Sequence, residues 1–88
     1  MKSTFITIQY DGFPVVFAKR LTDLAASFHS EDIRIIWESK NIISDAKSIL
    51  GIMALEVAKG TVLKLTVEGP QEEEAERSLA ALFIIQDF

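Results

Sequence analysis

The chain has 88 residues, of which 49% are hydrophobic, and a formal net charge of −4 at pH 7. This length allows one small sheet-and-helix core and not two, so we expect a single domain over residues 1–88. The negative charge disfavours nucleic-acid binding, which depends on neutralising phosphates, and the absence of cysteine excludes disulfides, thiolate metal sites and cysteine nucleophiles.

The N-terminal sequence MKSTFITIQY is followed directly by Asp11, and the uncharged runs are shorter than the ~20 residues that span a bilayer. We therefore predict no signal peptide, no membrane span and a cytoplasmic location.

Alternating side chains over residues 1–9 predict a strand, which the turn-forming residues between positions 11 and 14 end. Apolar residues then recur every three or four positions from Phe17, which predicts an amphipathic helix to about His29. Residues 33–37 read as a strand with Ile33, Ile35 and Trp37 on one face. A turn at residues 39–41 predicts a hairpin with residues 42–44.

A short helix is expected to begin at Asp45 or Ser48, whose side-chain oxygens can cap it, and to run to about Leu55. Residues 61–67 alternate clearly enough to predict another strand. After Gly69, three successive acids at positions 72–74 favour the start of a last helix. The resulting order, β-α-β-β-α-β-α, predicts an α+β fold in which helices cover one face of an antiparallel sheet.

Residues 46–60, AKSILGIMALEVAKG, join a serine at a helix start to an apolar helix and a Lys-Gly turn. This segment resembles the HPr family, the histidine-containing phosphocarriers of the bacterial sugar phosphotransferase system. The resemblance implies a two-layer open-faced sandwich, with a four-stranded antiparallel sheet covered on one face by three helices. It also implies a role in sugar transport or its regulation.

The family carries its phosphate-accepting histidine in a Gly-Ile/Leu-His-Ala-Arg-Pro segment, whereas residues 12–18 read GFPVVFA. The histidine position falls on Pro14 or Val15, and the arginine position on Val16 or Phe17. Neither Pro14 nor Val15 can bond phosphorus, so histidine phosphotransfer is not expected. Lys19 and Arg20 follow one turn later, where they either bind an anion or form a solvated helix face.

The resemblance points instead to Ser48, because a histidine-less, catabolite-repression HPr-like branch of the family keeps a serine at this position. In Gram-positive relatives that serine is phosphorylated by HPr kinase/phosphorylase, and the product binds a catabolite-control transcription factor. The family also places apolar residues here on a partner-binding surface, which corresponds to Ile49, Leu50 and Met53, with Lys47 as an aid to kinase docking. Ser48 as a helix cap alone, with these apolar residues in the core, is the competing interpretation.

Other chemistry finds little support in the sequence. The single histidine, His29, is expected at the C-terminal end of the first helix, where a capping role competes with that of a cryptic phosphate acceptor. No spacing typical of metal ligands occurs, and we expect neither a cofactor nor enzymatic activity. The regulatory interpretation therefore has two alternatives, a residual phosphocarrier and a purely structural or oligomeric domain.

Apolar residues exceed what one small core can bury. They cluster at residues 13–17 and again near the C-terminus, at Phe83, Ile84, Ile85 and Phe88. The first cluster either buries the former phosphate site or forms a contact surface. Self-association into a homodimer is a hypothesis that follows from this surplus.

Overall fold

The computed structural model describes residues 1–85, which form one sheet and three α-helices. The elements in chain order are β1 (Lys2–Thr7), α1 (Val15–Ser27), β2 (Asp32–Trp37), the 3-10 turn η1 (Glu38–Lys40), β3 (Ile42–Asp45), α2 (Ile49–Met53), β4 (Val62–Glu68) and α3 (Glu72–Ile85). This order confirms the predicted sequence of strands and helices.

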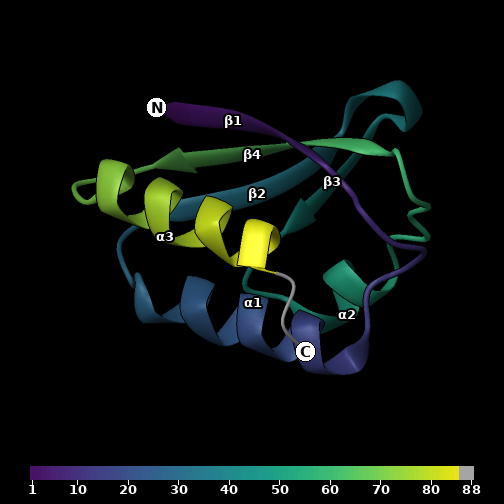
Figure 1. Cartoon of the computed structure of the whole chain (residues 1–88). Helices are drawn as coiled ribbons and strands as arrows, with labels where there is room; N and C mark the ends of the chain where they lie inside the picture. The colour runs from purple at the N-terminus through teal and green to yellow at the C-terminus, as the bar shows by residue number, and fades with distance from the viewer. Residues whose placement is uncertain (86–88) are drawn as a thin grey trace.

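The four strands pair in the order β1-β4-β2-β3, and every pairing is antiparallel. All three helices lie on the same side of this sheet, and its other side is open (Figure 1). The predicted α+β two-layer arrangement is therefore confirmed. Because β4 returns between β1 and β2, the first and third strands become the two edges of the sheet.

The alternation of each strand decides which side chains meet the helices. Ile33 and Ile35 of β2 and Leu63 and Leu65 of β4 are at most 1% exposed. These side chains form the core with the apolar stripe of α1, as their period-2 and period-3.6 patterns predicted.

Three helix boundaries differ from the predicted ones. Helix α1 begins at Val15, two residues before Phe17, because the Pro14 carbonyl already accepts the first intrahelical hydrogen bond, from the Ala18 N–H at 2.9 Å. It ends at Ser27 rather than His29, where the Phe28 N–H turns to the Ala25 carbonyl. Helix α2 ends at Met53 and not at Leu55, whose side chain folds into the core at 3% exposure.

A buried carboxylate, which the sequence pattern did not suggest, joins β2 to α3. Glu31 is 3% exposed, and its Oε2 atom accepts the Gln71 N–H at 2.9 Å, just before α3. Gly69 lies against it with φ +154°, and a Cβ atom there would come within 2.6 Å of the same oxygen. At the helix start itself, the N-terminal amine donates to Glu72 at 2.9 Å and lowers the pKa of that carboxyl.

None of the helices within residues 1–85 is both long enough and apolar enough to cross a bilayer.

Candidate functional site

The loop before α1 is held in place by hydrogen bonds to the loop before β4. The Gly12 N–H donates to the Val57 carbonyl at 2.8 Å, and Asp11 Oδ1 accepts the Lys59 N–H at 2.9 Å. Gly12 has φ +76°, a conformation that glycine adopts without strain. These contacts set where Pro14 begins the helix.

The start of α1 presents backbone donors without a reactive side chain. Pro14 is the N-cap residue and makes no side-chain capping bond, and the first turn contains no acidic residue. Val15 and Val16 follow, at 60% and 53% exposure. The free N–H groups of the first turn suit an anion. Neither Pro14 nor Val15, however, has an atom that can accept a phosphoryl group.

The two basic residues in the first half of α1, Lys19 and Arg20, lie on the exposed face of the helix. Lys19 pairs with Asp23 at 3.1 Å, an exposed i, i+4 ion pair. Arg20 is also exposed. The interpretation of both residues as a solvated helix face agrees with this placement.

Aromatic rings fill the space beneath the start of α1. Phe17 is fully buried, and its ring centroid lies 5.4 Å from that of Phe13 and 5.1 Å from that of Phe83. Tyr10 meets Phe17 edge-on at 6.3 Å, and burial raises the pKa of its hydroxyl. The cluster at residues 13–17 therefore divides, with both phenylalanines facing the interior and both valines facing solvent.

His29 lies beyond the opposite end of α1. It is exposed, and the thirteen residues of the helix separate it from Pro14 by roughly 20 Å. The expected position of His29 at the C-terminal end of α1 is confirmed. A phosphate on His29 would not reach the donors at the helix start.

Ser48 is the N-cap of α2, which confirms the second of the two predicted helix starts, Asp45 and Ser48. Its Oγ atom accepts the Gly51 N–H at 3.2 Å, and its carbonyl accepts the Ile52 N–H at 3.0 Å. The residue is exposed, and its backbone is extended, with φ −103° and ψ 110°. The hydroxyl is thus both a structural cap and open to solvent.

Lys47 has a partner that the sequence did not suggest. Its Nζ atom donates to the carbonyl of Phe28 at 2.8 Å and lies 3.5 Å from that of His29. The backbone N–H of Lys47 meanwhile donates to Asp45 Oδ1 at 2.9 Å. Lys47 therefore ties the loop before Ser48 to the C-terminal end of α1, where a positive charge is favoured.

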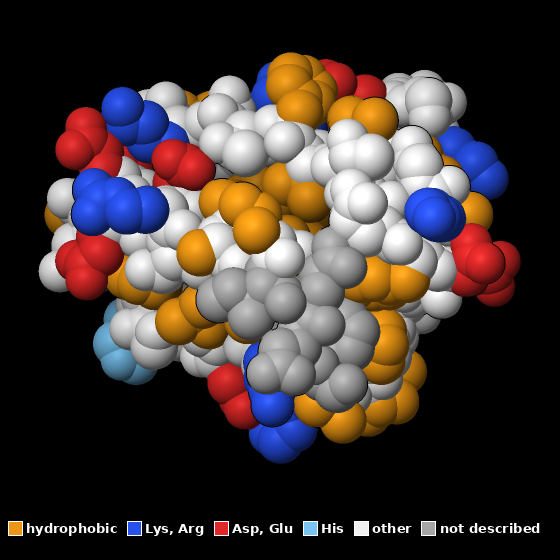
Figure 2. All heavy atoms as spheres, in the orientation of Figure 1, with side chains coloured by type: hydrophobic (Ala, Val, Ile, Leu, Met, Phe, Trp, Pro, Cys, Tyr) orange, Lys and Arg blue, Asp and Glu red, His pale blue; other side chains and the backbone are white. Residues whose placement is uncertain are grey.

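Helix α2 divides its apolar residues between the core and the surface. Ile52 is fully buried, whereas Ile49, Leu50 and Met53 are 38%, 81% and 43% exposed. We call these three exposed residues the α2 patch. Figure 2 shows hydrophobic side chains at the lower right, over the positions of α2 and the start of α1 in Figure 1. These exposures agree with a surface position for the three residues and contradict the competing interpretation that places them in the core.

Replacement of Ser48 by alanine is expected to destabilise the protein by about 1 kcal/mol, because the Gly51 N–H loses its acceptor. Urea unfolding followed by circular dichroism measures this. Ser48→Asp retains a capping oxygen and should cost less. Equal stability of Ser48→Ala and the wild type would contradict the capping role.

Within the described residues, no group of three or more histidine, cysteine, aspartate or glutamate side chains is placed to hold a metal ion. Ile84, from the apolar C-terminal cluster, is 78% exposed, and Phe83 belongs to the core; Phe88 lies outside the described residues.

Comparisons with known proteins agree with this architecture. Residues 2–84 match the sequence model of the family described as "PTS HPr component phosphorylation site". The chain is 36% identical over 83 residues to the phosphocarrier protein HPr of Neisseria meningitidis, and the match covers 93% of this chain and 89% of the relative.

Two solved structures are similar over almost their whole length. HPr-C-His of Thermoanaerobacter tengcongensis has a TM-score of 0.82 at 39% identity, covering 96% of this chain and 92% of that one. Crh of Bacillus subtilis, described as a catabolite repression protein and an intertwined dimer with a swapping domain, has a TM-score of 0.75 at 27% identity, covering 100% and 98%.

Proposed function

Because the chain belongs to the HPr family of the phosphotransferase system, we propose that it is a regulatory, partner-binding member that does not carry phosphate on histidine. The observation that supports this most directly is the start of α1, where Pro14 and Val15 lack any nucleophilic atom. Phosphoryl transfer through histidine needs a ring nitrogen beside the donors that receive the phosphate oxygens. In this chain the start of α1 has the backbone N–H donors, but Pro14 and Val15 supply no imidazole ring beside them.

We propose Ser48 as the regulatory phosphorylation site and HPr kinase/phosphorylase as the enzyme that modifies it. The exposed hydroxyl gives a kinase access. A phosphate there would carry about −1.5 to −2 charges next to the positive end of α2 and its Gly51 N–H. The modification would therefore change the surface potential without opposing the helix.

The α2 patch is the proposed partner surface. Leu50 is 81% exposed, and Met53 next to it on the helix has a flexible side chain that adapts to different partners. A phosphate on Ser48 would add charge at the edge of this patch, so that modification and binding are linked. The expected partner is a protein such as a catabolite-control transcription factor, and no direct contact with nucleic acid is needed.

Lys47 has a different role in this proposal from the kinase docking suggested by its sequence position. Its ammonium is held at the C-terminal end of α1. We propose that it positions the loop that carries Ser48, while docking depends on the α2 patch. On this proposal the chain is a cytoplasmic, single-domain regulatory protein without catalytic activity of its own.

The test is an intact-mass measurement after incubation with ATP and HPr kinase/phosphorylase. The wild type is expected to gain one phosphate and Ser48→Ala none. Ser39→Ala, which removes an exposed serine from η1, should be modified like the wild type. No gain of mass in the wild type would favour a purely structural or oligomeric domain.

A further inference from the structure

The two edges of the sheet differ in how well they are protected against another strand. The edge strand β3 has four residues and ends in Asp45, whereas β1 has six residues. The only charge in β1 is that of Lys2, at its first position, where the ammonium pairs with Glu73 at 3.3 Å. β1 also contains no proline or glycine. Edge strands of this length usually carry charges or proline that prevent pairing.

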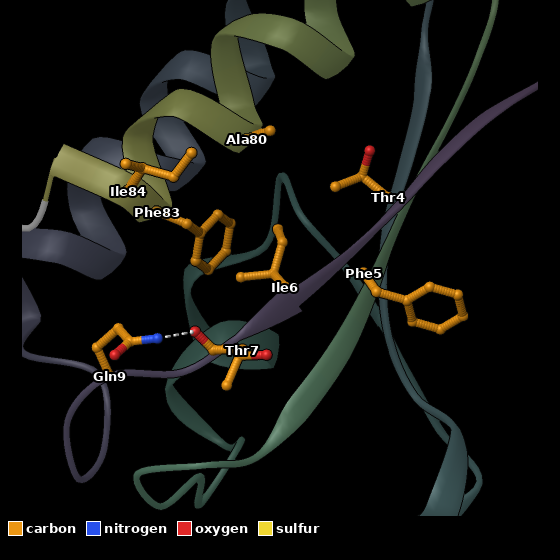
Figure 3. Close-up of a pocket in the computed structure, with 8 residues that line it drawn as sticks. All are labelled: Thr4, Phe5, Ile6, Thr7, Gln9, Ala80, Phe83 and Ile84. Atoms are coloured by element: carbon orange, nitrogen blue, oxygen red, sulfur yellow. Dashed lines mark hydrogen bonds between the residues drawn. The ribbon is translucent and has the colours of Figure 1, made fainter.

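The free backbone groups of β1 can be assigned from the hydrogen bonds that follow it. The Ile8 N–H and carbonyl both bond toward β4, to Thr61 and Gly60 at 2.8 Å. Since these groups alternate along an antiparallel strand, those of Ser3, Phe5 and Thr7 point away from the sheet. The Thr7 carbonyl confirms this direction, because it accepts the Gln9 side chain at 3.1 Å (Figure 3).

A groove of about 370 Å³ runs between β1 and α3, lined by Thr4, Ile6, Ala80, Phe83 and Ile84 among others. Figure 3 shows Ile6 and Phe83 pointing toward each other, while Phe5 points to the open side of the sheet. Ile84 at the rim is 78% exposed and Phe5 is 63% exposed. Beside this edge, Ile84 of α3 therefore offers an exposed apolar side chain on the helix-covered face of the sheet, and Phe5 offers one on the open face.

We propose that β1 pairs antiparallel with β1 of a second copy of this chain, about a two-fold axis at Phe5. In this register Ser3 of each copy lies opposite Thr7 of the other, and the two Phe5 rings are neighbours on the open face. The two four-stranded sheets join into one eight-stranded sheet, and the exposed Ile84 side chains approach across the seam. The backbone N–H of the partner's Ser3 then takes the place of the Gln9 amide as the donor to the Thr7 carbonyl.

A second copy fits this edge for two reasons. The proposed register is self-complementary, as an isologous interface must be, and it places no like charges directly opposite one another, since Lys2 lies opposite Ile8. The flank of α3 beside the groove also carries both signs, with Lys2 and Arg77 near Glu73 and Glu76. Although the chain has a net charge of −4, the two copies would meet through a surface of balanced charge.

Sedimentation equilibrium across a series of protein concentrations tests the proposal with two matched variants. Phe5 and Ile43 are each 63% exposed on the open face of the sheet, at its opposite edges. Phe5→Glu places two carboxylates together at the axis, and within its own chain the new carboxylate faces Lys64, the cross-strand neighbour. We expect the wild type and Ile43→Glu to dimerise alike and Phe5→Glu to dimerise about tenfold more weakly.

Thr7→Pro is a second variant for the same edge. It removes an outward N–H that the pairing with β4 does not use, so the fold should be retained while dimerisation is weakened. A wild type that stays monomeric at every concentration would overturn the proposal.

A dimer that Ile43→Glu disrupts would assign the contact to the open face of the sheet instead, and one that Leu50→Glu disrupts would assign it to the α2 patch. A dimer that neither Phe5→Glu nor Thr7→Pro weakens would indicate an exchange of β1 between copies. Each of these results would reject pairing at the β1 edge. None depends on Ser48, so the proposed regulatory role is tested separately.

Discussion

Incubation with enzyme I and phosphoenolpyruvate is expected to leave the wild-type chain without acid-labile phosphate, whereas a Pro14→His/Val16→Arg double variant is expected to acquire it. Pro14 is the N-cap of α1, so an imidazole there would lie beside the free N–H groups of the first turn. Val16 is 53% exposed, so the arginine can reach solvent and balance the phosphate charge. The double variant reproduces the histidine and arginine spacing of the family.

Three further variants make this experiment decisive. Val15→His tests the other possible position of the histidine, and Val16→Arg alone should remain unlabelled because it lacks an acceptor. His29→Asn removes the single natural histidine. Phosphate on the wild type that disappears in His29→Asn would show that the protein is a residual phosphocarrier and reject the regulatory proposal.

The largest loss of stability at the start of α1 is expected for Phe17→Ala, at about 3–5 kcal/mol. Phe17 is fully buried and its ring packs against those of Phe13 and Phe83. Truncation removes this packing and leaves a cavity at the junction of α1 and α3. The expected loss measures how far this chain uses the start of α1 for packing.

Val16→Ala is the matched control, because its side chain is 53% exposed one position earlier in the same helix. We expect it to change the free energy of unfolding by less than about 0.5 kcal/mol. Urea unfolding monitored by circular dichroism gives both values. Similar losses for the two variants would mean that the aromatic cluster contributes no more than a surface valine.

The two variants also separate stability from partner binding. Val15 and Val16 are exposed at the start of α1, which contacts α2. A partner that covers both helices should bind Val16→Ala more weakly although the protein is equally stable. Phe17→Ala would weaken binding only to the extent that the fold is lost.

Much of the fold follows from local patterns. Alternation along β4 and three-and-four spacing along α1 place the same residues in the core that the structure buries, such as Leu65 and Leu21. These patterns are reliable because every apolar residue on one face of a strand or helix gains by facing the same layer. The ends of α1 and α2 do not follow from these patterns, because they depend on which backbone carbonyl accepts each terminal N–H.

The candidate site was predicted in part. The cap at Ser48 could be read from the sequence because a hydroxyl that accepts a bond from the first turn is a local feature. The role of Lys47 could not, because its acceptor on Phe28 lies 19 positions away and meets it only after the sheet has formed. The same holds for Glu31, whose partner Gln71 is 40 positions away.

The sequence by itself determined that neither Pro14 nor Val15 can accept a phosphoryl group, because a proline or valine side chain cannot bond phosphorus in any fold. It also determined the order of the elements, through side-chain periods that each segment carries alone. The tertiary structure decided which apolar residues are left on the surface and which strand becomes an unprotected edge. Both depend on contacts between segments far apart in the chain, and β1 is an edge only because β4 returns to pair beside it.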